Sequence, residues 1–466
     1  MWSRSSVDRC RLHALLLSGV LLSSAMAQPA AELLTRMRRT YQEEASIYLK
    51  RNTVLRFERS AEGTVAIRES VEEELYLKDH GGSAKEREVY YSGLMELVDL
   101  EAYTLSFQGK GYKRMNVDRI DHKDRRDEEV FHDEIKTASF VMPSITAGSI
   151  AHVAHTVKYQ EGRLVTGHFF GSYIPTEESS LTVITDPGIE VEVRTFHLSD
   201  SALVRTDRLE RGKRVQRLTM QRVPAVAYEP NAPSWKHHAP HAQLVVTVPE
   251  AAPAASAIDR LYHWYMELAD STTSRIHPDV RALSDSITAG VRDPIDRATR
   301  LFQWVQEHIR YVAFEDGMNG FIPAAPEEVL RVRYGDCKGM SGLLSTLLRA
   351  SGASAHMTWI GTRDLPYAYA EMPGPAATNH MIVALDLADT TLFLDATSRT
   401  CGFGVPSGFI QGKEAMIASD ASSARIVKVP IMDPSFSTIT DSVHARMDGT
   451  ALVGRGSARF TGYDRY

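Results

Sequence analysis

Cysteine is nearly missing from this sequence. The 466 residues include three cysteines, and Cys10 belongs to an N-terminal segment that we expect to be removed, which leaves Cys337 and Cys401. Two cysteines exclude a scaffold that several disulfides hold together. They leave two interpretations of Cys337: a free thiol, or the disulfide partner of Cys401. We favour the free thiol because Cys337 stands at the predicted start of a helix.

Long apolar runs and an excess of charge of one sign are missing too. Apart from the N-terminal segment, no apolar stretch approaches the ~20 residues of a membrane-spanning helix, so we expect a chain that does not span the membrane. Lys and Arg number 53 against 59 Asp and Glu, and the net charge is −6. Without a basic stripe we expect no nucleic-acid partner. The length suggests two or three domains and predicts no oligomeric state.

The N-terminus has the pattern of a secretory signal peptide. Three arginines precede the apolar run 15–22, and the small residues 25–27 fit a cleavage site. Cys10 precedes the apolar run, so it is not placed to accept a lipid at the cleavage point. We therefore predict a signal peptide over residues 1–27 and a periplasmic or secreted mature protein that begins at Gln28.

Short alternating runs of apolar and polar residues characterise the segment 28–230. Alternation is typical of half-buried strands, and helix signals are scarce, so we predict a β-sandwich-like domain. The charged run 121–134 is predicted to be a solvated loop or hairpin tip that needs no partner. The predicted strands are 53–57, 64–67, 72–77, 139–142, 149–157, 164–170, 181–184 and 218–223.

Residues 231–254 are rich in proline and histidine and are predicted to be a linker. His237, His238 and His241 raise the possibility of a metal site. Metal ligands usually come with further Cys, His or acidic partners, and none lies nearby in the sequence. We therefore interpret the histidines as polar linker residues and expect neither a metal nor a cofactor.

Helix and strand patterns mix over residues 255–430, which predicts an α+β core. Helices are predicted at 256–268, at 294–310 and from Cys337 onward, followed by strands at 355–361, 379–387 and 391–395. The tail 431–466 starts another alternating pattern around Asp448-Gly449, a strong hairpin signal. These residues are too few for an independent domain, so they either dock onto the rest or begin a domain of a longer protein.

Cys337 follows Gly335-Asp336, where the preceding extended stretch ends. Asp336 is a favourable N-cap, and an apolar stripe follows at helical spacing, so Cys337 is predicted to lie in the first turn of a buried helix. The positive end of the helix dipole and the neighbouring Lys338 both favour a thiolate there. The stripe consists of Met340, Leu343, Leu344, Leu347 and Leu348.

Two predicted strands that follow the helix bring a possible base, His380, close to a carboxylate, Asp395. Residues 379–387 and 391–395 alternate around a tight turn at 388–390, which predicts an antiparallel hairpin. In such a hairpin, the residue numbers of each opposed pair add up to the same value. A loop centred near residue 388 therefore places His380 opposite Asp395, give or take two positions. The order Cys337, His380, Asp395 is that of a nucleophile, a base and an orienting carboxylate. Taken singly, each is more often a structural residue, so the prediction depends on their combination.

Several ordered blocks resemble bacterial transglutaminase-like proteins of the papain-like superfamily, over roughly residues 255–420. The blocks are 309–311, 326–330, 333–338, 343–352, 379–383 and 394–398. The resemblance implies Cys337 as nucleophile, His380 as base and Asp395 as orienter, but it implies no substrate. Gly339 stands where this subgroup often has an acidic residue, and no catalytic calcium site is evident. More weakly, 140–143 and 148–150 resemble a domain of unknown function that often precedes this core in secreted bacterial proteins.

Two classes of function fit these features. The first is a thiol enzyme that transfers an acyl group from an amide or peptide bond, with water as acceptor in a peptidase or amidase and an amine in a transglutaminase. Its partner would be a peptide or protein amide. The second is a non-catalytic envelope binding module on a degenerate scaffold of the same kind. A thiol in an open cleft favours the enzyme, and a filled cleft favours the module.

Overall fold

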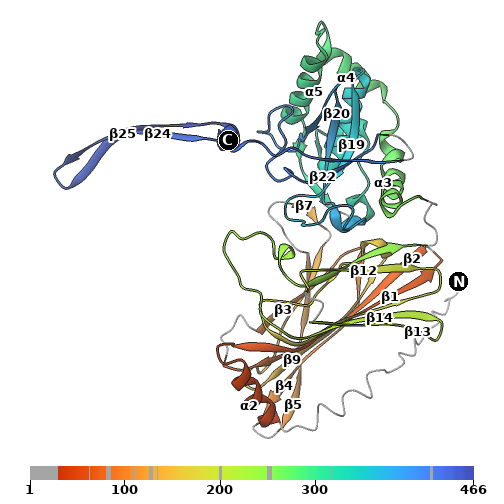
Figure 1. Ribbon diagram of the computed structural model, residues 1–466, viewed down its shortest axis with the longest axis vertical. Coiled ribbons are helices and arrows are strands. Elements are labelled where there is room, and N and C mark those ends of the chain that lie inside the picture. The colour runs from red at the N-terminus through yellow and green to blue at the C-terminus, as the bar shows by residue number, and fades with distance from the viewer. Residues whose placement is uncertain are drawn as a thin grey trace, which may run out of the picture.

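The computed structural model describes residues 30–465 apart from 62, 80–84, 109–110, 125–129, 134, 199–201, 249–253, 316 and 420–422. The predicted signal peptide, residues 1–27, lies outside the described residues. Within them, a strand-rich N-terminal region (β1 to β15) precedes a core of helices and strands (α3 to β23) and a final pair of strands (Figure 1). This order confirms the predicted α+β fold class.

An eight-stranded sheet forms the frame of the N-terminal region, in the order β13-β14-β11-β1-β2-β9-β4-β5. Neighbouring strands are antiparallel, except β1 and β11, which are parallel. Gly63 has φ 125°, a conformation that glycine adopts without strain, and begins β2 directly after the turn from β1. The strands are β1 (Ser46–Ser60), β2 (Gly63–Tyr76), β4 (Met95–Phe107), β5 (Tyr112–Asn116), β9 (Ile150–Tyr159), β11 (Thr176–Thr185), β13 (Leu203–Glu210) and β14 (Lys213–Val223).

Two three-stranded sheets cover one face of this frame. The first packs Leu244 in a cluster with Ala66 of β2, and the second packs Phe140 in a cluster with Tyr76 of β2. Ala66 and Tyr76 are an even number of residues apart on one strand, so they point to the same face. The result is the predicted sandwich-like arrangement. The sheets are β10 (His168–Phe169), β15 (His241–Thr247) and β12 (Glu190–Phe196), and β3 (Glu86–Tyr91), β8 (Lys136–Val141) and β6 (Ile120–Asp124).

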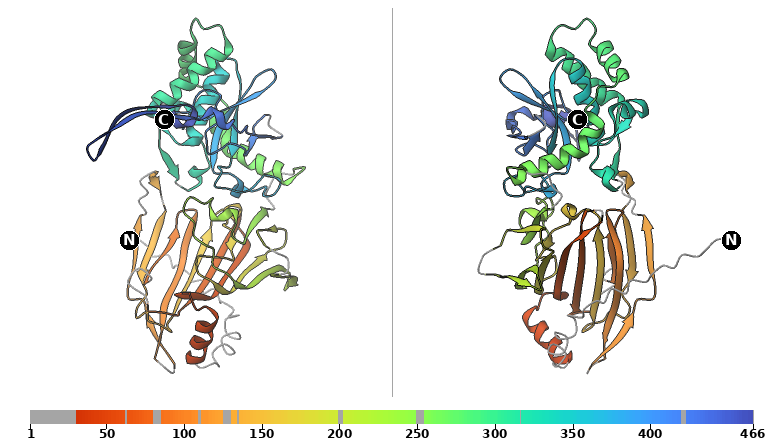
Figure 2. Two further views of the ribbon diagram at one scale, coloured as in Figure 1. Left: turned by 60° about the vertical axis from the view of Figure 1, so that its left-hand side comes forward. Right: turned by 90° about the vertical axis from the view of Figure 1, so that its right-hand side faces the viewer.

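Helix α2 (Ala30–Thr40) packs on the opposite face of the frame. Its apolar residues Leu34 and Met37 form a buried cluster with Leu75 and Ile150. Leu75 is the neighbour of Tyr76 on β2, so the two side chains point to opposite faces. Both faces of the large sheet are therefore covered over part of their area, as the second view in Figure 2 shows for α2.

The structure corrects the linker prediction for residues 241–247. They form β15, the middle strand of its sheet, which pairs with β12 from Glu190↔Thr247 to Phe196↔His241. His241 to Val245 are buried. Prolines on either side hide this strand in the sequence, and its partner lies far upstream in the chain. A composition typical of a linker therefore belongs here to a strand that non-local pairing holds in place.

The charged run 121–134 also has a partner that the sequence did not indicate. It contains β7 (Val130–Asp133), which pairs in parallel with β17 (Ala313–Glu315) of the core. Figure 1 shows β7 at the junction of the two parts of the molecule. The run is therefore a structural bridge, because a backbone ladder joins the N-terminal region to the core.

The core packs its helices against a five-stranded antiparallel sheet in the order β21-β20-β19-β22-β23. Across the described part of the chain, no helix combines the length and the apolar character needed to cross a membrane. The helices are α3 (Ala257–Thr273), α4 (Pro278–Thr288), α5 (Pro294–His308), α6 (Pro326–Val332) and α7 (Cys337–Ala350). The strands are β19 (Ser354–Ile360), β20 (His380–Asp386), β21 (Thr391–Leu394), β22 (Glu414–Ile417) and β23 (Arg425–Lys428), with a short parallel pair of β16 (Arg310–Tyr311) and β18 (Tyr334–Gly335).

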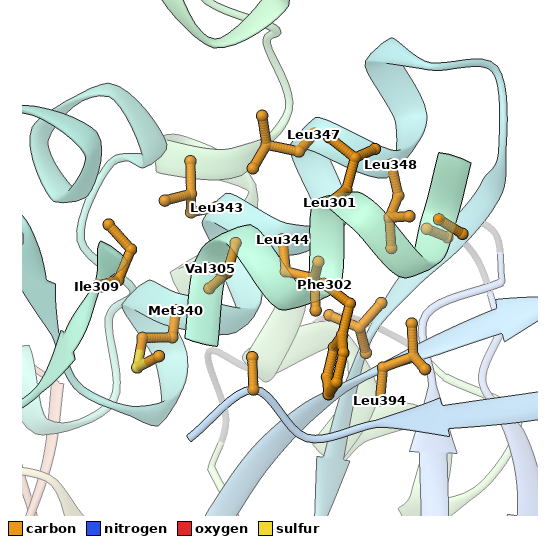
Figure 3. Close-up of a cluster of buried hydrophobic side chains, with 14 of the residues drawn as sticks. Leu301, Phe302, Val305, Ile309, Met340, Leu343, Leu344, Leu347, Leu348 and Leu394 are labelled. Atoms are coloured by element: carbon orange, nitrogen blue, oxygen red, sulfur yellow. The ribbon is translucent and has the colours of Figure 1, made fainter. Parts of the chain in front are cut away.

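Helix α7 lies at the centre of the core (Figure 3). Its predicted apolar stripe packs against Leu301, Phe302 and Val305 of α5 and against Leu394 of β21. All the members of the stripe are at most 1% exposed. Because both ends of α7 are fixed by this packing, its first residue has a defined position relative to β20 and β21.

The N-terminal region and the core share buried contacts. Val245 of β15 belongs to one hydrophobic cluster with Tyr265 of α3, Trp359 of β19 and Tyr367 of the loop after β19. The Tyr367 hydroxyl is 2.7 Å from His241 Nε2 and accepts a bond from Gln243 Nε2 at 3.1 Å. A shared core of this kind holds the two parts in one relative position.

The predicted C-terminal hairpin is confirmed. Strands β24 (Ile439–Asp448) and β25 (Ala451–Phe460) pair along their whole length, and Gly449 makes the turn with φ 63°. Every residue of the two strands is exposed, and the hairpin projects away from the core in Figure 1.

Candidate active site

Cys337 is the first residue of α7, as predicted. Asp336 is the N-cap, and its Oδ1 accepts a hydrogen bond from the Gly339 N–H at 2.8 Å. The residues just before it form β18, whose pairing with β16 fixes how the chain enters the helix. The thiol is partly exposed. The local sequence thus places a sulfur atom at the positive end of a buried helix.

Lys338 does not act as an isolated cation beside the thiol. Its ammonium group forms a buried ion pair with Asp336, the residue that caps the helix. The charge of Lys338 is therefore balanced two residues away. Contrary to the expectation from the sequence, Lys338 is therefore not a free cation beside Cys337, which does stand at the start of the helix.

His380 and Asp395 meet through the predicted hairpin. His380 is the first residue of β20, and Asp395 directly follows β21. Val383 pairs with Leu394, and the same register places Asp395 opposite Ile382. Ile382 is two positions from His380, which is within the predicted tolerance. Residues 380 and 382 share one face of the strand, so the two side chains can meet. His380 Nε2 donates to Asp395 Oδ2 at 3.1 Å.

The carboxylate of Asp395 is buried and fully hydrogen-bonded. Its residue is 1% exposed. In addition to His380, Oδ2 accepts from Ser407 Oγ at 2.6 Å. Oδ1 accepts from the Thr397 N–H at 3.2 Å and from Thr397 Oγ1 at 2.6 Å. Four donors compensate for the cost of burying the charge, and they fix the plane of the carboxylate against the imidazole.

These contacts change the acid–base properties of both groups. Burial alone lowers the pKa of His380, but the charge and the hydrogen bond of Asp395, together with Cys337, outweigh burial and raise the pKa to about 10. Burial alone raises the pKa of Asp395, whereas the charge and hydrogen bond of His380 and the bonds from Ser407 and Thr397 lower it below its ordinary value. The imidazole is therefore held as a cation next to an ionised carboxylate.

Cys337 lies close enough to His380 to contribute to the raised pKa of the imidazole. Because Asp395 occupies Nε2, the nitrogen that remains for the thiol is Nδ1. Ser341, one turn after Cys337 on α7, donates to the Met381 carbonyl at 3.0 Å and so ties the helix to the strand of His380. Phe409 packs edge-on against the imidazole, with ring centroids 5.3 Å apart. The structure thus brings all three predicted residues into one connected line.

Cys337 and His380 lie beside a pocket with a volume of about 390 Å³. Cys337 and His380 are part of its wall, as are Asn379 and Lys338. This volume is near the lower end of the range of roughly 300–1,000 Å³ that is usual for ligand pockets. The thiol therefore faces space that a small part of a substrate can occupy.

The remaining sequence candidates have structural contacts. Cys401 is a buried free thiol that donates to the Val405 carbonyl at 3.1 Å, and Cys337 is also free. His237 contacts the Arg363 carbonyl at 2.8 Å, and His241 contacts the Ala239 carbonyl at 2.8 Å. Within the described ranges, no group of three or more His, Cys, Asp and Glu residues is arranged to hold a metal ion.

Comparison with known proteins supports a thiol-enzyme family at the level of the fold. Residues 281–383 match the transglutaminase-like superfamily, a segment that includes Cys337 and His380 but ends before Asp395. Residues 68–227 match DUF3857, a domain of unknown function. The chain therefore carries a transglutaminase-like domain behind a DUF3857 domain. No curated protein matches the sequence.

One solved structure agrees with this assignment at the level of the fold. A candidate protease from Parabacteroides distasonis is 13% identical and has a TM-score of 0.63, with 83% of this chain and 72% of that chain covered. A candidate cysteine protease from Cytophaga hutchinsonii is 10% identical and has a TM-score of 0.22, with 82% and 90% covered. At these identities the first shows a shared fold alone, and the second adds no argument.

Sequence reasoning missed two residues that position the site. Ser341 gave a weak signal, since it is a polar residue one turn after Cys337 within an apolar helix. Ser407 gave none, because it lies in a loop rich in glycine and proline with no periodic pattern. Ser407 comes close to Asp395 only when the loop between them folds.

Proposed function

We propose that this protein is a thiol enzyme that transfers an acyl group from an amide or peptide bond, with Cys337 as nucleophile, His380 as acid and base, and Asp395 as the group that orients His380. The observation that carries the proposal is the continuous line from the Cys337 thiol through His380 to the buried Asp395, at the wall of an open pocket. A pocket of this kind favours an enzyme over a non-catalytic module with a filled cleft.

The geometry suggests the following chemistry. The Cys337 thiolate, whose proton is held on the His380 imidazolium, bonds through its sulfur to the amide carbonyl carbon. The carbon–nitrogen bond then breaks, the amine leaves with the proton from His380, and a thioester remains. Water or a second amine gives its proton to His380 and attacks the thioester, which releases the thiolate. The first acceptor makes the reaction a hydrolysis, and the second makes it a transamidation.

Backbone N–H groups at the start of α7 are the proposed donors to the oxyanion. The Gly339 N–H is already bonded to Asp336 Oδ1, so it does not serve. The N–H groups of Cys337 and Lys338 belong to the first turn, where no intrahelical acceptor exists. One such donor is often worth ~2.7–4 kcal/mol of transition-state stabilisation.

We also propose a periplasmic or secreted location, on the basis of the signal-peptide pattern over residues 1–27. The substrate is then a peptide or protein amide outside the cytoplasm. The intact mass of the protein exported from a bacterial host tests the location: a chain that begins at Gln28 supports it, and an uncleaved cytoplasmic chain contradicts it.

The activity is tested with fluorescent iodoacetamide and with glutamine- and peptide-amide substrates. Wild type should be labelled at Cys337 and should release amine or ammonia. Cys337→Ala should lose both the label and the turnover. Cys401→Ala is the matched control, because that thiol is buried and bonded to Val405, and it should keep both. Labelling without turnover of any amide would contradict the enzyme and favour the binding module.

A further inference from the structure

The wall of the active-site pocket is built from both parts of the molecule. The core supplies the thiol and the imidazole, and the N-terminal region supplies Ser92, Leu94 and Ile135. Leu94 belongs to the turn between β3 and β4, and Ile135 lies between β7 and β8. A region that contains none of the three reacting residues therefore contributes side chains to the space beside the thiol.

Backbone hydrogen bonds fix the turn of Ser92 and Leu94 within the N-terminal region, and a strand pairing fixes the segment before Ile135 against the core. Ser92 and Met95 exchange backbone bonds of 2.8 and 3.2 Å across the turn, and the Leu94 carbonyl accepts from the Gln160 N–H at 3.1 Å. Ile135 follows closely after β7, which pairs with β17 of the core. Ala313, the first residue of β17, lines the same pocket. The ladder thus joins the two parts at the pocket itself.

Two of the three residues that the N-terminal region contributes to the pocket are apolar. Leu94 and Ile135 are half-buried. The core adds aromatic and sulfur-containing walls, and the rings of Tyr265 and Trp359 are stacked with centroids 5.1 Å apart. The other members are Tyr311, Phe321 and Met381. Apolar surface that stays beside a reactive thiol is available to bind an apolar group of the substrate.

The charges in the lining leave little for an ionic substrate group. Among the described residues, Asp336 and Lys338 are the acidic and basic residues that line the pocket, and they pair with each other. His380 is bound to Asp395. A charged side chain would lose its hydration on entering and gain no opposite charge in return.

We propose that Leu94 and Ile135 are specificity-determining residues, which select an amide substrate with a neutral, apolar side chain next to the attacked carbonyl. This inference rests on the proposed acyl-transfer function of Cys337. It assigns a role to the DUF3857 domain. This domain forms the part of the pocket wall that selects the acyl group of the substrate, while the transglutaminase-like domain performs the chemistry. The volume of about 390 Å³ fits a short piece of a peptide and no folded partner.

The test uses peptidyl chloromethyl ketones, which alkylate a thiol with loss of chloride and need no turnover. Two reagents carry the same peptide, with leucine or glutamate next to the ketone. The readout is the ratio of the Cys337 alkylation rates with the leucine and the glutamate reagent. We expect wild type to react faster with the leucine reagent by about tenfold or more. This factor is the discrimination that one or two methylene groups give in an apolar pocket.

Leu94→Lys should lower this ratio by about tenfold, because it removes apolar surface and adds a cation that favours glutamate. Leu94→Ala and Ile135→Ala should each lower it by a smaller factor, and they keep the test decisive if the lysine variant does not fold. Val98→Lys is the matched control, because Val98 is 59% exposed on neighbouring β4 and does not line the pocket, so its ratio should equal that of wild type.

The alkylation rate with iodoacetamide separates the two proposals. That reagent carries no side chain, so its rate should be the same in wild type, Leu94→Ala and Val98→Lys. A wild-type ratio near one, an unchanged ratio in Leu94→Lys, or reaction with iodoacetamide but with neither ketone would overturn the specificity role. Failure of amide turnover with the leucine preference intact would instead contradict the enzymatic proposal and leave the selective wall standing.

Discussion

Replacing Asp395 by asparagine should disable His380 without removing it. Oδ2 of Asp395 accepts from His380 Nε2 at 3.1 Å and from Ser407 Oγ at 2.6 Å, and Oδ1 accepts from Thr397. An amide offers one oxygen and one NH₂ group. With its oxygen towards Thr397, it points NH₂ at His380, so Nε2 must accept and the ring proton moves to Nδ1. That nitrogen then cannot take the thiol proton.

The size of the effect follows from the roles of the two residues. A wrong imidazole tautomer in a triad of this type costs about 10⁴-fold in turnover. Loss of proton transfer in His380→Ala costs typically ~10²–10⁴-fold. Because Asp395 acts through His380, the double variant His380→Ala/Asp395→Asn should be little slower than His380→Ala. Residues that act as a unit give such non-additive losses.

Rates of iodoacetamide alkylation and of amide turnover are compared in wild type, the two single variants and the double variant. Asp389→Asn is the control, because it makes the same chemical change at an exposed position in the turn between β20 and β21, and it should behave as wild type. Losses that multiply in the double variant would refute the reasoning, since Asp395 would then act independently of His380.

Two further predictions concern the surroundings of this pair. Ser407→Ala removes a donor to a buried carboxylate and should lower the free energy of unfolding by ~1.5–3 kcal/mol in urea titrations, and an unchanged value would mean that Ser407 does not support Asp395. The raised pKa of His380 stabilises the fold fully below its ordinary value of 6.5, and this contribution is lost as the pH rises through about 10. The stability difference between wild type and His380→Ala should therefore shrink over that range, and a constant difference from pH 6 to 10 would contradict the pairing.

Much of the site could be predicted because its signals are local. Asp336 caps the helix that begins at Cys337, the apolar stripe of α7 is buried at the expected spacing, and the tight turn after β20 sets a register correct within two positions. Each of these features depends on neighbours in the sequence and on one periodicity. Their geometry is therefore present in the sequence before any long-range contact is known.

Two of the elements that escaped prediction depend on partners far away in the chain. β15 lies among prolines and is a strand only because β12 and β10 pair with it. β7 lies in a charged run and is a strand only because β17 offers an edge. Hydrophobic periodicity indicates which face of a strand is buried, but it does not identify the strand that pairs with it. Both of these strands lie in the N-terminal region, and each makes contact with the core.

The source of positive charge near the thiol illustrates the same distinction. In the sequence, Lys338 is the obvious cation, because it is adjacent to Cys337. In the fold its ammonium group is paired with Asp336 and serves the helix cap. The cation that contacts the thiol is His380, which comes from another element and which Asp395 keeps protonated. The thiolate of the proposed mechanism therefore depends on the hairpin of β20 and β21 more than on the residue next to it. For this reason, variants of Asp395 test the site more sharply than variants of Lys338.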